Sequence, residues 1–142
     1  MYLAFYKAPG DWSDKLIRWW TKSKYSHVEL VTDDFSTMYS SSGMDGGVRK
    51  KPHYYNVNTW TYVEVSVSEE LVKDIFSETN GSKYDWFGIL GFILPLQDRT
   101  NRWFCSEWCS NALKCGGDKR MYLQEPSKLS PGKLYNLVKK DK

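Results

Sequence analysis

Several short runs of the sequence have the alternation or the β-rich composition of strands. The run Trp60 to Val67 alternates, which puts Thr61, Val63, Val65 and Val67 on one face of a predicted strand. A turn at Asp33-Asp34 joins two further runs into a predicted hairpin, and a loop is expected over Gly43 to Gly47. In chain order, the predicted strands are Tyr2 to Tyr6, His27 to Thr32, Ser36 to Ser41 and Trp60 to Val67.

Other segments repeat apolar residues at helical spacing and carry capping residues. The first predicted helix follows Asp11 or Ser13 as its cap, and it has Trp12, Leu16, Ile17 and Trp20 on one face. Ser68 caps the second, and Gly116-Gly117 closes the helix that begins at Cys105. The predicted helices cover Trp12 to Trp20, Glu69 to about Asn80, Tyr84 to about Leu94, Cys105 to Cys115, and Pro131 through Leu137. This order of elements predicts an α+β fold.

The composition suits one globular unit. The chain has 142 residues with 41% hydrophobic residues, which predicts a single domain over residues 1–142. The first residues lack the basic and apolar regions of a signal peptide. The longest apolar stretch, Trp86 to Leu96, is shorter than the roughly 20 residues that a membrane-spanning helix needs. We therefore expect a cytoplasmic protein without stable membrane insertion, and a monomer.

Charge and cysteine content narrow the range of partners. The net charge of +3 is mild, and its lysines are scattered apart from Arg49-Lys50-Lys51 and the C-terminal tail, so no nucleic-acid partner is expected. Three cysteines make a poor disulfide framework and fit a reducing compartment. The chain has no Cys-x-x-Cys knuckle and no phosphate-binding loop, so neither a metal nor another cofactor is expected.

Two residues carry the candidate chemistry. Cys105 follows Trp103-Phe104 and begins a predicted helix, where the positive end of the helix dipole favours a thiolate. His27 begins a predicted strand and is a candidate base for that thiol. From the pattern alone, the favoured interpretation of Cys105 is a small buried residue of an amphipathic helix, because Trp108, Cys109 and Ala112 share its face.

Two groups of segments resemble a known family. The run Ile17-Arg18-Trp19-Trp20 followed by Tyr25-Ser26-His27-Val28-Glu29-Leu30-Val31 resembles the N-terminal motif of circularly permuted NlpC-type papain-like proteins, in their YiiX-like branch. Tyr84-Asp85, Gly88 to Gly91 and Phe104-Cys105-Ser106-Glu107 resemble its C-terminal motif, and Ser130-Pro131 with Leu134 resembles the closing segment. The resemblance covers nearly the whole chain in the permuted order, histidine before cysteine. Such short chains occur in bacteria and bacteriophages.

The resemblance implies a papain-like core and a mechanism. In that fold a helix with the nucleophile packs on an antiparallel sheet with the base, so Cys105 would attack a carbonyl carbon and His27 would transfer the proton. The backbone amide of Cys105 would help bind the oxyanion. Neighbours in the matching segments are the expected substrate-binding residues: Tyr84, Ser26 and Trp103.

The third catalytic position departs from the family pattern. The family's carboxylate or histidine would fall near Tyr39-Ser40-Ser41, where none is present, and Ser40 is the nearest positional match. Glu29 is the alternative, because it lies two residues beyond His27 on the same strand face. A backbone carbonyl is the third option. We expect Ser40 to face the imidazole across the hairpin, or Glu29 to reach it along the strand.

The resemblance implies a cysteine peptidase or amidase. Its expected substrate is a peptide, an amide or an acyl compound, with cell-wall peptide first by analogy with the wider superfamily. A lipid-directed acyltransferase or thioesterase of the same fold is one alternative. A non-catalytic bacteriophage binding or structural module is another, and reactivity of the Cys105 thiol separates it from the enzymes.

Overall fold

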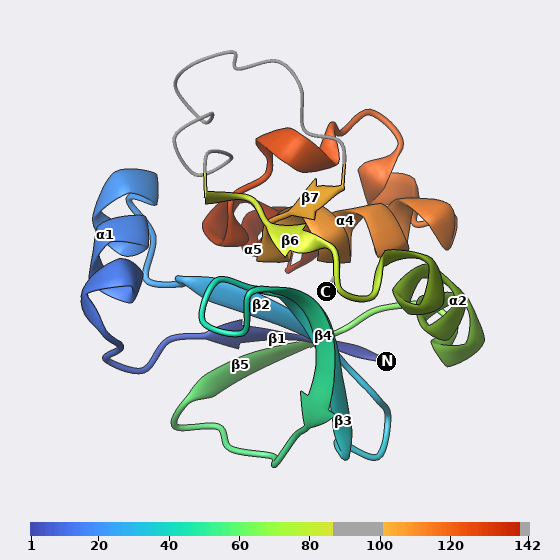
Figure 1. Cartoon of the computed structure of the whole chain (residues 1–142), viewed down its shortest axis with the longest axis horizontal. Coiled ribbons are helices and arrows are strands. Elements are labelled where there is room, and N and C mark those ends of the chain that lie inside the picture. The colour runs from blue at the N-terminus through green and yellow to red at the C-terminus, as the bar shows by residue number, and fades with distance from the viewer. Residues whose placement is uncertain (87–100, 140–142) are drawn as a thin grey trace.

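The computed structural model describes residues 1–86 and 101–139, and in them the chain forms a mixed α+β fold (Figure 1). The strands are β1 (Tyr2–Tyr6), β2 (His27–Val31), β3 (Thr37–Ser42), β4 (Gly47–Pro52), β5 (Trp60–Glu64), β6 (Lys83–Tyr84) and β7 (Arg102–Trp103). The helices are α1 (Trp12–Thr21), α2 (Glu69–Thr79), α4 (Cys105–Cys115) and α5 (Pro131–Val138), with short 3-10 turns η1 (Lys119–Met121) and η2 (Pro126–Lys128).

The strands form one sheet in the order β5-β1-β2-β3-β4-β6-β7. Neighbours pair antiparallel, except for the parallel pair β6 and β7. Strand β1 pairs with both β2 and β5, so the first strand of the chain lies inside the sheet. Its middle residues Leu3, Ala4 and Phe5 are fully buried, as a central strand of apolar residues requires.

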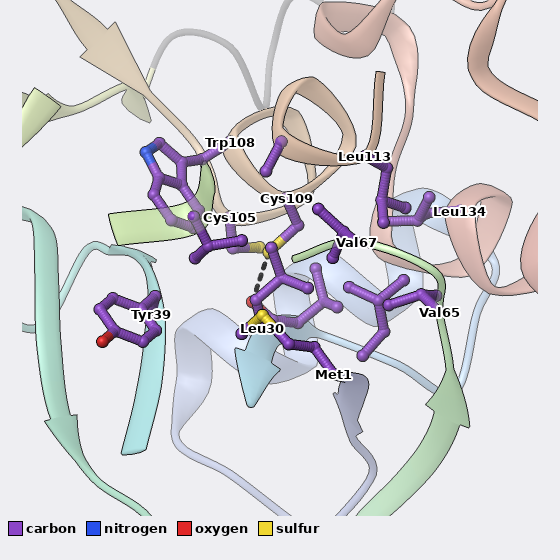
Figure 2. Packing of buried hydrophobic residues seen from close by; sticks show 14 of the residues in the cluster. Met1, Leu30, Tyr39, Val65, Val67, Cys105, Trp108, Cys109, Leu113 and Leu134 are labelled. Atoms are coloured by element: carbon purple, nitrogen blue, oxygen red, sulfur yellow. Dashed lines mark hydrogen bonds between the residues drawn. The ribbon is translucent and has the colours of Figure 1, made fainter. Parts of the chain in front are cut away.

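Helix α4 supplies much of the hydrophobic core. Seven of its residues are buried, and it contacts β2, β3 and the turn η2. Figure 2 shows its side chains Cys105, Trp108, Cys109 and Leu113 packed against residues from other parts of the chain, which are Met1, Leu30, Val65, Val67 and Leu134. The Ser106 hydroxyl also donates to the Leu129 carbonyl at 2.5 Å, which fixes the helix to the segment before α5. The first turn of α4 is therefore held from several directions.

Helix α1 has a well-formed start but a largely uncovered surface. The Asp11 carboxylate accepts from the backbone N–H groups of Ser13 and Asp14, as a capping residue does. None of the helix residues is buried, and Trp12 and Trp19 are each 72% exposed. Figure 1 shows α1 at one side of the molecule, apart from α2, α4 and α5.

Most of the predicted elements are confirmed. Strand β1 has its predicted bounds, and α1, α2, α4 and α5 begin or end within a residue or two of the predicted positions. The α+β prediction is also confirmed. Strand β5 ends at Glu64 rather than Val67, and β4 was not predicted, because its basic residues hide the pattern of a strand.

One predicted helix falls mainly outside the described residues. It was expected from Tyr84 to about Leu94, and residues 87–94 belong to the segment not described. Tyr84 itself lies in strand β6 rather than at a helix start, because its strand pairs with β7. In the parts of the chain that the structure describes, none of the helices combines the length and the apolar character that crossing a bilayer requires.

Candidate active site

Cys105 is the first residue of α4. The helix starts there because Phe104 is extended, and the Phe104 N–H donates to the Glu107 carboxylate at 3.4 Å. At this position the backbone N–H of Cys105 has no acceptor within the helix. The side chain of Cys105 is only 3% exposed, so the thiol sits between the helix and the sheet.

His27 lies between the thiol and a carboxylate. Its Nε2 is 2.5 Å from Oε1 of Glu29, two residues along β2. A carboxylate only accepts, so Nε2 carries the proton of this bond and leaves Nδ1 for Cys105. Burial alone would lower the pKa of His27, but the charge and hydrogen bond of Cys105, together with Glu29, raise it to about 10. The imidazole is therefore stabilised in its charged form by both neighbours.

Glu29 is a buried carboxylate held by two partners. It is 1% exposed, and Arg49 on β4 donates to both of its oxygens, from Nη2 to Oε1 at 2.6 Å and from Nη1 to Oε2 at 2.7 Å. Burial would raise the pKa of Glu29, but His27 and Arg49 lower it to about 2. Glu29 therefore remains ionised, and the two-pronged contact fixes its orientation toward the imidazole.

Arg49 is in turn held by a second carboxylate. Its Nε donates to Oδ2 of Asp45 at 2.8 Å, and Lys51 also pairs with Asp45. Burial would raise the pKa of Asp45, but its hydrogen bonds from Lys51 and Arg49 hold that pKa below the ordinary range. The chain of contacts therefore runs from the thiol through His27, Glu29 and Arg49 to Asp45.

This network borders a cavity of about 290 Å³. Its lining comes from α1 and from strands β1 to β6, and includes His27, Glu29, Arg49, Tyr84, Ile17 and Trp60. The Trp60 ring lies 6.5 Å from that of His27, centroid to centroid. Cys105 is not among the described residues that line the cavity.

Ser40 does not have the expected contact. Its hydroxyl donates to the Val28 carbonyl at 2.8 Å, and it lies 3.8 Å from the Cys109 sulfur. We expected Ser40 or Glu29 to orient the imidazole, and the contact belongs to Glu29. Ser40 is opposite Arg49 in the β3-β4 ladder and is fully buried, so a backbone carbonyl satisfies its hydroxyl instead.

The three expected substrate-binding residues have different surroundings. Tyr84 and Ser26 line the cavity, and burial, followed by the charge of Cys105, raises the pKa of the Tyr84 phenol. Ser26 is buried, and its hydroxyl accepts from Arg18 at 3.3 Å. Trp103 is half-buried in β7 and packs against the core rather than lining the cavity, while its carbonyl accepts from the Ser41 hydroxyl at 2.6 Å.

The other cysteines and histidine have separate environments. Burial raises the pKa of Cys109 well above its ordinary value, whereas Cys115 is exposed at the end of α4. His53 follows β4 and its Nε2 is 2.9 Å from the Tyr62 hydroxyl. Within residues 1–86 and 101–139, no group of three or more His, Cys, Asp or Glu side chains is arranged to hold a metal ion.

Arg49, like Asp45, is a residue of this network that the sequence did not indicate. It stands in a basic run, Arg49-Lys50-Lys51, which has the appearance of a solvated surface. Neighbouring side chains of a strand point to opposite faces, however, and Arg49 is half-buried while Lys50 is exposed. The sequence signal that could have revealed Arg49 is a polar segment after the predicted hairpin, as long as the hairpin's second strand. If this segment is taken as a further antiparallel strand, one residue of the basic run lies opposite Ser40.

Comparison with models of known protein families gives no match, and comparison with curated proteins gives no significant match either.

Proposed function

We propose that the protein is a cysteine hydrolase that cleaves an amide or peptide bond, with Cys105 as nucleophile and His27 as the proton-transfer group. The observation that carries this proposal is the position of His27, whose imidazole interacts with the Cys105 thiol and with the Glu29 carboxylate. A thiol, an imidazole and an orienting acceptor are the parts that nucleophilic catalysis by cysteine requires.

The contacts support a definite role for each group. His27 takes the thiol proton at Nδ1, and the resulting thiolate attacks the substrate carbonyl carbon. His27 then gives that proton to the departing amine, which leaves an acyl group on the Cys105 sulfur. Water, deprotonated by His27, attacks this thioester and releases the acid and the thiol. The backbone N–H of Cys105, which has no acceptor within the helix, donates to the oxyanion of each tetrahedral intermediate.

Glu29 and Arg49 are positioning residues in this proposal. The Glu29 carboxylate fixes the imidazole tautomer that presents Nδ1 to the thiol, and it stabilises the imidazolium. Arg49 keeps Glu29 ionised and prevents it from turning away. An ionised orienter stabilises a thiolate–imidazolium pair better than a serine hydroxyl would, which supports a catalytic role for this cluster over a purely structural one.

The resemblance to permuted NlpC-type papain-like proteins supports the reaction class and makes cell-wall peptide the first substrate to test. The cavity beside His27 combines aromatic walls with charged groups such as Asp14 and Lys51, which suits a peptide better than a bare acyl chain. A lipid-directed acyltransferase or thioesterase would use the same thiol chemistry, so the choice of substrate panel decides between them.

The first test is selective labelling of the thiols at mildly acidic pH. With iodoacetamide and mapping by mass spectrometry, we expect Cys105 to react faster than Cys109 and faster than the more exposed Cys115. Replacing His27 with alanine should suppress this labelling, and it should lower turnover of a reporter amide or a cell-wall peptide by ~10²–10⁴-fold. Glu29→Gln should reduce both rates more than Ser40→Ala does, because only Glu29 contacts the imidazole.

The matched controls are His53→Ala and Cys109→Ala, which should leave Cys105 labelling unchanged in protein that melts cooperatively. Preferred labelling of Cys115 would contradict the nucleophile assignment. Slow labelling of every thiol, with no turnover on amides, esters or thioesters, would instead indicate a non-catalytic module.

A further inference from the structure

Helix α1 has two sides with different surroundings. Ser13, Asp14 and Ile17 line the cavity beside His27. The opposite side presents Trp12, Leu16 and Trp19, which lie three and four residues apart and therefore share one face. Trp12 and Trp19 are 72% exposed and Leu16 is 46% exposed. One helix thus forms a wall of the cavity and turns three large apolar side chains outward.

Basic residues accompany this outward face. Lys15 and Lys22 lie along one flank of the helix, Lys24 follows its end, and all three are exposed. The nearby acidic residues are engaged elsewhere: Asp11 caps the helix, and Asp14 accepts from the Asp11 N–H and lines the cavity. Arg18 is also turned inward, toward the Ala8 carbonyl and Ser26. Over residues 11–24, four basic residues stand against the two acidic ones, so the formal charge on and beside the helix is positive.

We propose that the outward face of α1, formed by Trp12, Leu16 and Trp19 with Lys15, Lys22 and Lys24 beside it, docks the protein on an anionic lipid surface. Tryptophan fits the boundary between headgroups and acyl chains, because its ring is apolar and its N–H stays hydrated. Lysines beside such a helix are attracted to anionic headgroups. At 10 residues, α1 lies in the interface and is too short to cross it.

Docking in this way would hold the cavity beside the lipid surface, since α1 separates the two. The proposal does not depend on the hydrolase chemistry, because no residue of the outward face touches Cys105, His27 or Glu29 among the contacts of the described residues. Binding to lipid can therefore be measured with or without a known substrate.

Vesicle sedimentation tests the proposal directly. We expect the whole protein to sediment with vesicles of phosphatidylcholine and phosphatidylglycerol, and to bind far less to phosphatidylcholine alone. The double variant W12S/W19S should weaken binding by roughly tenfold or more, because two large apolar side chains are lost from the interface. Each of Lys15→Gln, Lys22→Gln and Lys24→Gln should weaken it by about fivefold at low salt, and added salt should weaken wild-type binding.

The matched controls are Leu123→Ser, which removes another exposed apolar side chain, and Lys133→Gln, which removes another exposed lysine. Neither should change vesicle binding. Three outcomes would overturn the proposal: no binding, equal binding to both kinds of vesicle, or binding that W12S/W19S leaves intact. A dimer in sedimentation equilibrium that W12S/W19S dissociates would also overturn it, because a second copy would then cover the face. Unchanged Cys105 labelling in W12S/W19S would show that the variant is folded.

Discussion

The interior of this protein has two buried regions of opposite character. One is the apolar core under α4, where Trp108, Leu113 and Leu30 are fully buried. The other is the charged cluster of His27 and Glu29 on β2 with Arg49 on β4. The apolar region is stabilised by contact with many neighbours and has no preferred partner. The charged region depends on a few specific bonds, because a buried charge without its partner is strongly unfavourable.

The difference matters because the stability of the fold accounts for the apolar region but does not by itself account for the charged region. Burying hydrocarbon removes it from water and stabilises the fold directly. A buried carboxylate and guanidinium lose their hydration and often give no net stabilisation over apolar residues of the same size. A charged cluster next to a thiol therefore supports the proposed catalytic role, and its bonds should respond to pH while the apolar core should not.

The largest effect should come from the apolar region. Trp108→Ala should lower the free energy of unfolding by ~3–5 kcal/mol, because it removes a fully buried ring and the bond from its Nε1 to the Thr79 hydroxyl at 2.9 Å. Trp19→Ala on α1 is the matched control, and it should change stability by only about 0.5 kcal/mol or less. Urea denaturation measures both. Similar losses for the two variants would mean that α1 is covered in solution.

Substitutions in the charged region should lower the free energy of unfolding by less, and the loss should depend on whether the partner residue is also changed. Arg49→Met should cost about 3 kcal/mol, because Glu29 would remain buried with His27 as its remaining side-chain partner among the described residues. Combining it with Glu29→Gln should recover part of this loss, since no carboxylate is then left without its guanidinium. The exposed pair of Lys73 and Glu69 is the control, and Lys73→Met should cost no more than about 0.5 kcal/mol. Strictly additive losses would show that Arg49 and Glu29 are not coupled.

The apolar region was largely predictable from the sequence, and the charged region only in part. Helical spacing from Cys105 to Ala112 predicted the buried face of α4, and Ser68 marked the start of α2. Strand spacing put Glu29 on the same face as His27, so their contact was one of the stated alternatives. Arg49 was missed because its bond to Glu29 spans 20 residues and depends on strand pairing, which no local pattern reveals.

Helix α1 shows a second limit of local patterns. Its apolar spacing predicted the helix with Trp12, Leu16, Ile17 and Trp20 on one face, but Trp12 and Leu16 are exposed whereas Ile17 lines the cavity on the other side. Periodicity indicates which residues lie together on a helix, whereas coverage depends on what the rest of the chain brings against them. The same amphipathic pattern therefore became a core element in α4 and an open surface in α1.

The smallest effect is the pH dependence that only the charged region should show. Burial disfavours the charged form of His27, yet Cys105 and Glu29 raise its pKa from about 6.5 to about 10. Because the folded-state pKa is the higher one, the stabilisation is fully present below about pH 6.5 and is lost as the pH rises toward about 10. The gap in unfolding free energy between wild type and His27→Gln should therefore shrink over this window by at least about 1.4 kcal/mol, the equivalent of one pKa unit. Urea denaturation at a series of pH values measures this gap.

The controls are two further variants. Trp108→Ala should differ from wild type by the same amount at every pH, since it removes no titrating group. The difference in unfolding free energy between wild type and His53→Gln should change at acidic pH, because burial lowers the pKa of His53. A gap for His27→Gln that stays constant or widens with rising pH would mean that neither Cys105 nor Glu29 stabilises the imidazolium.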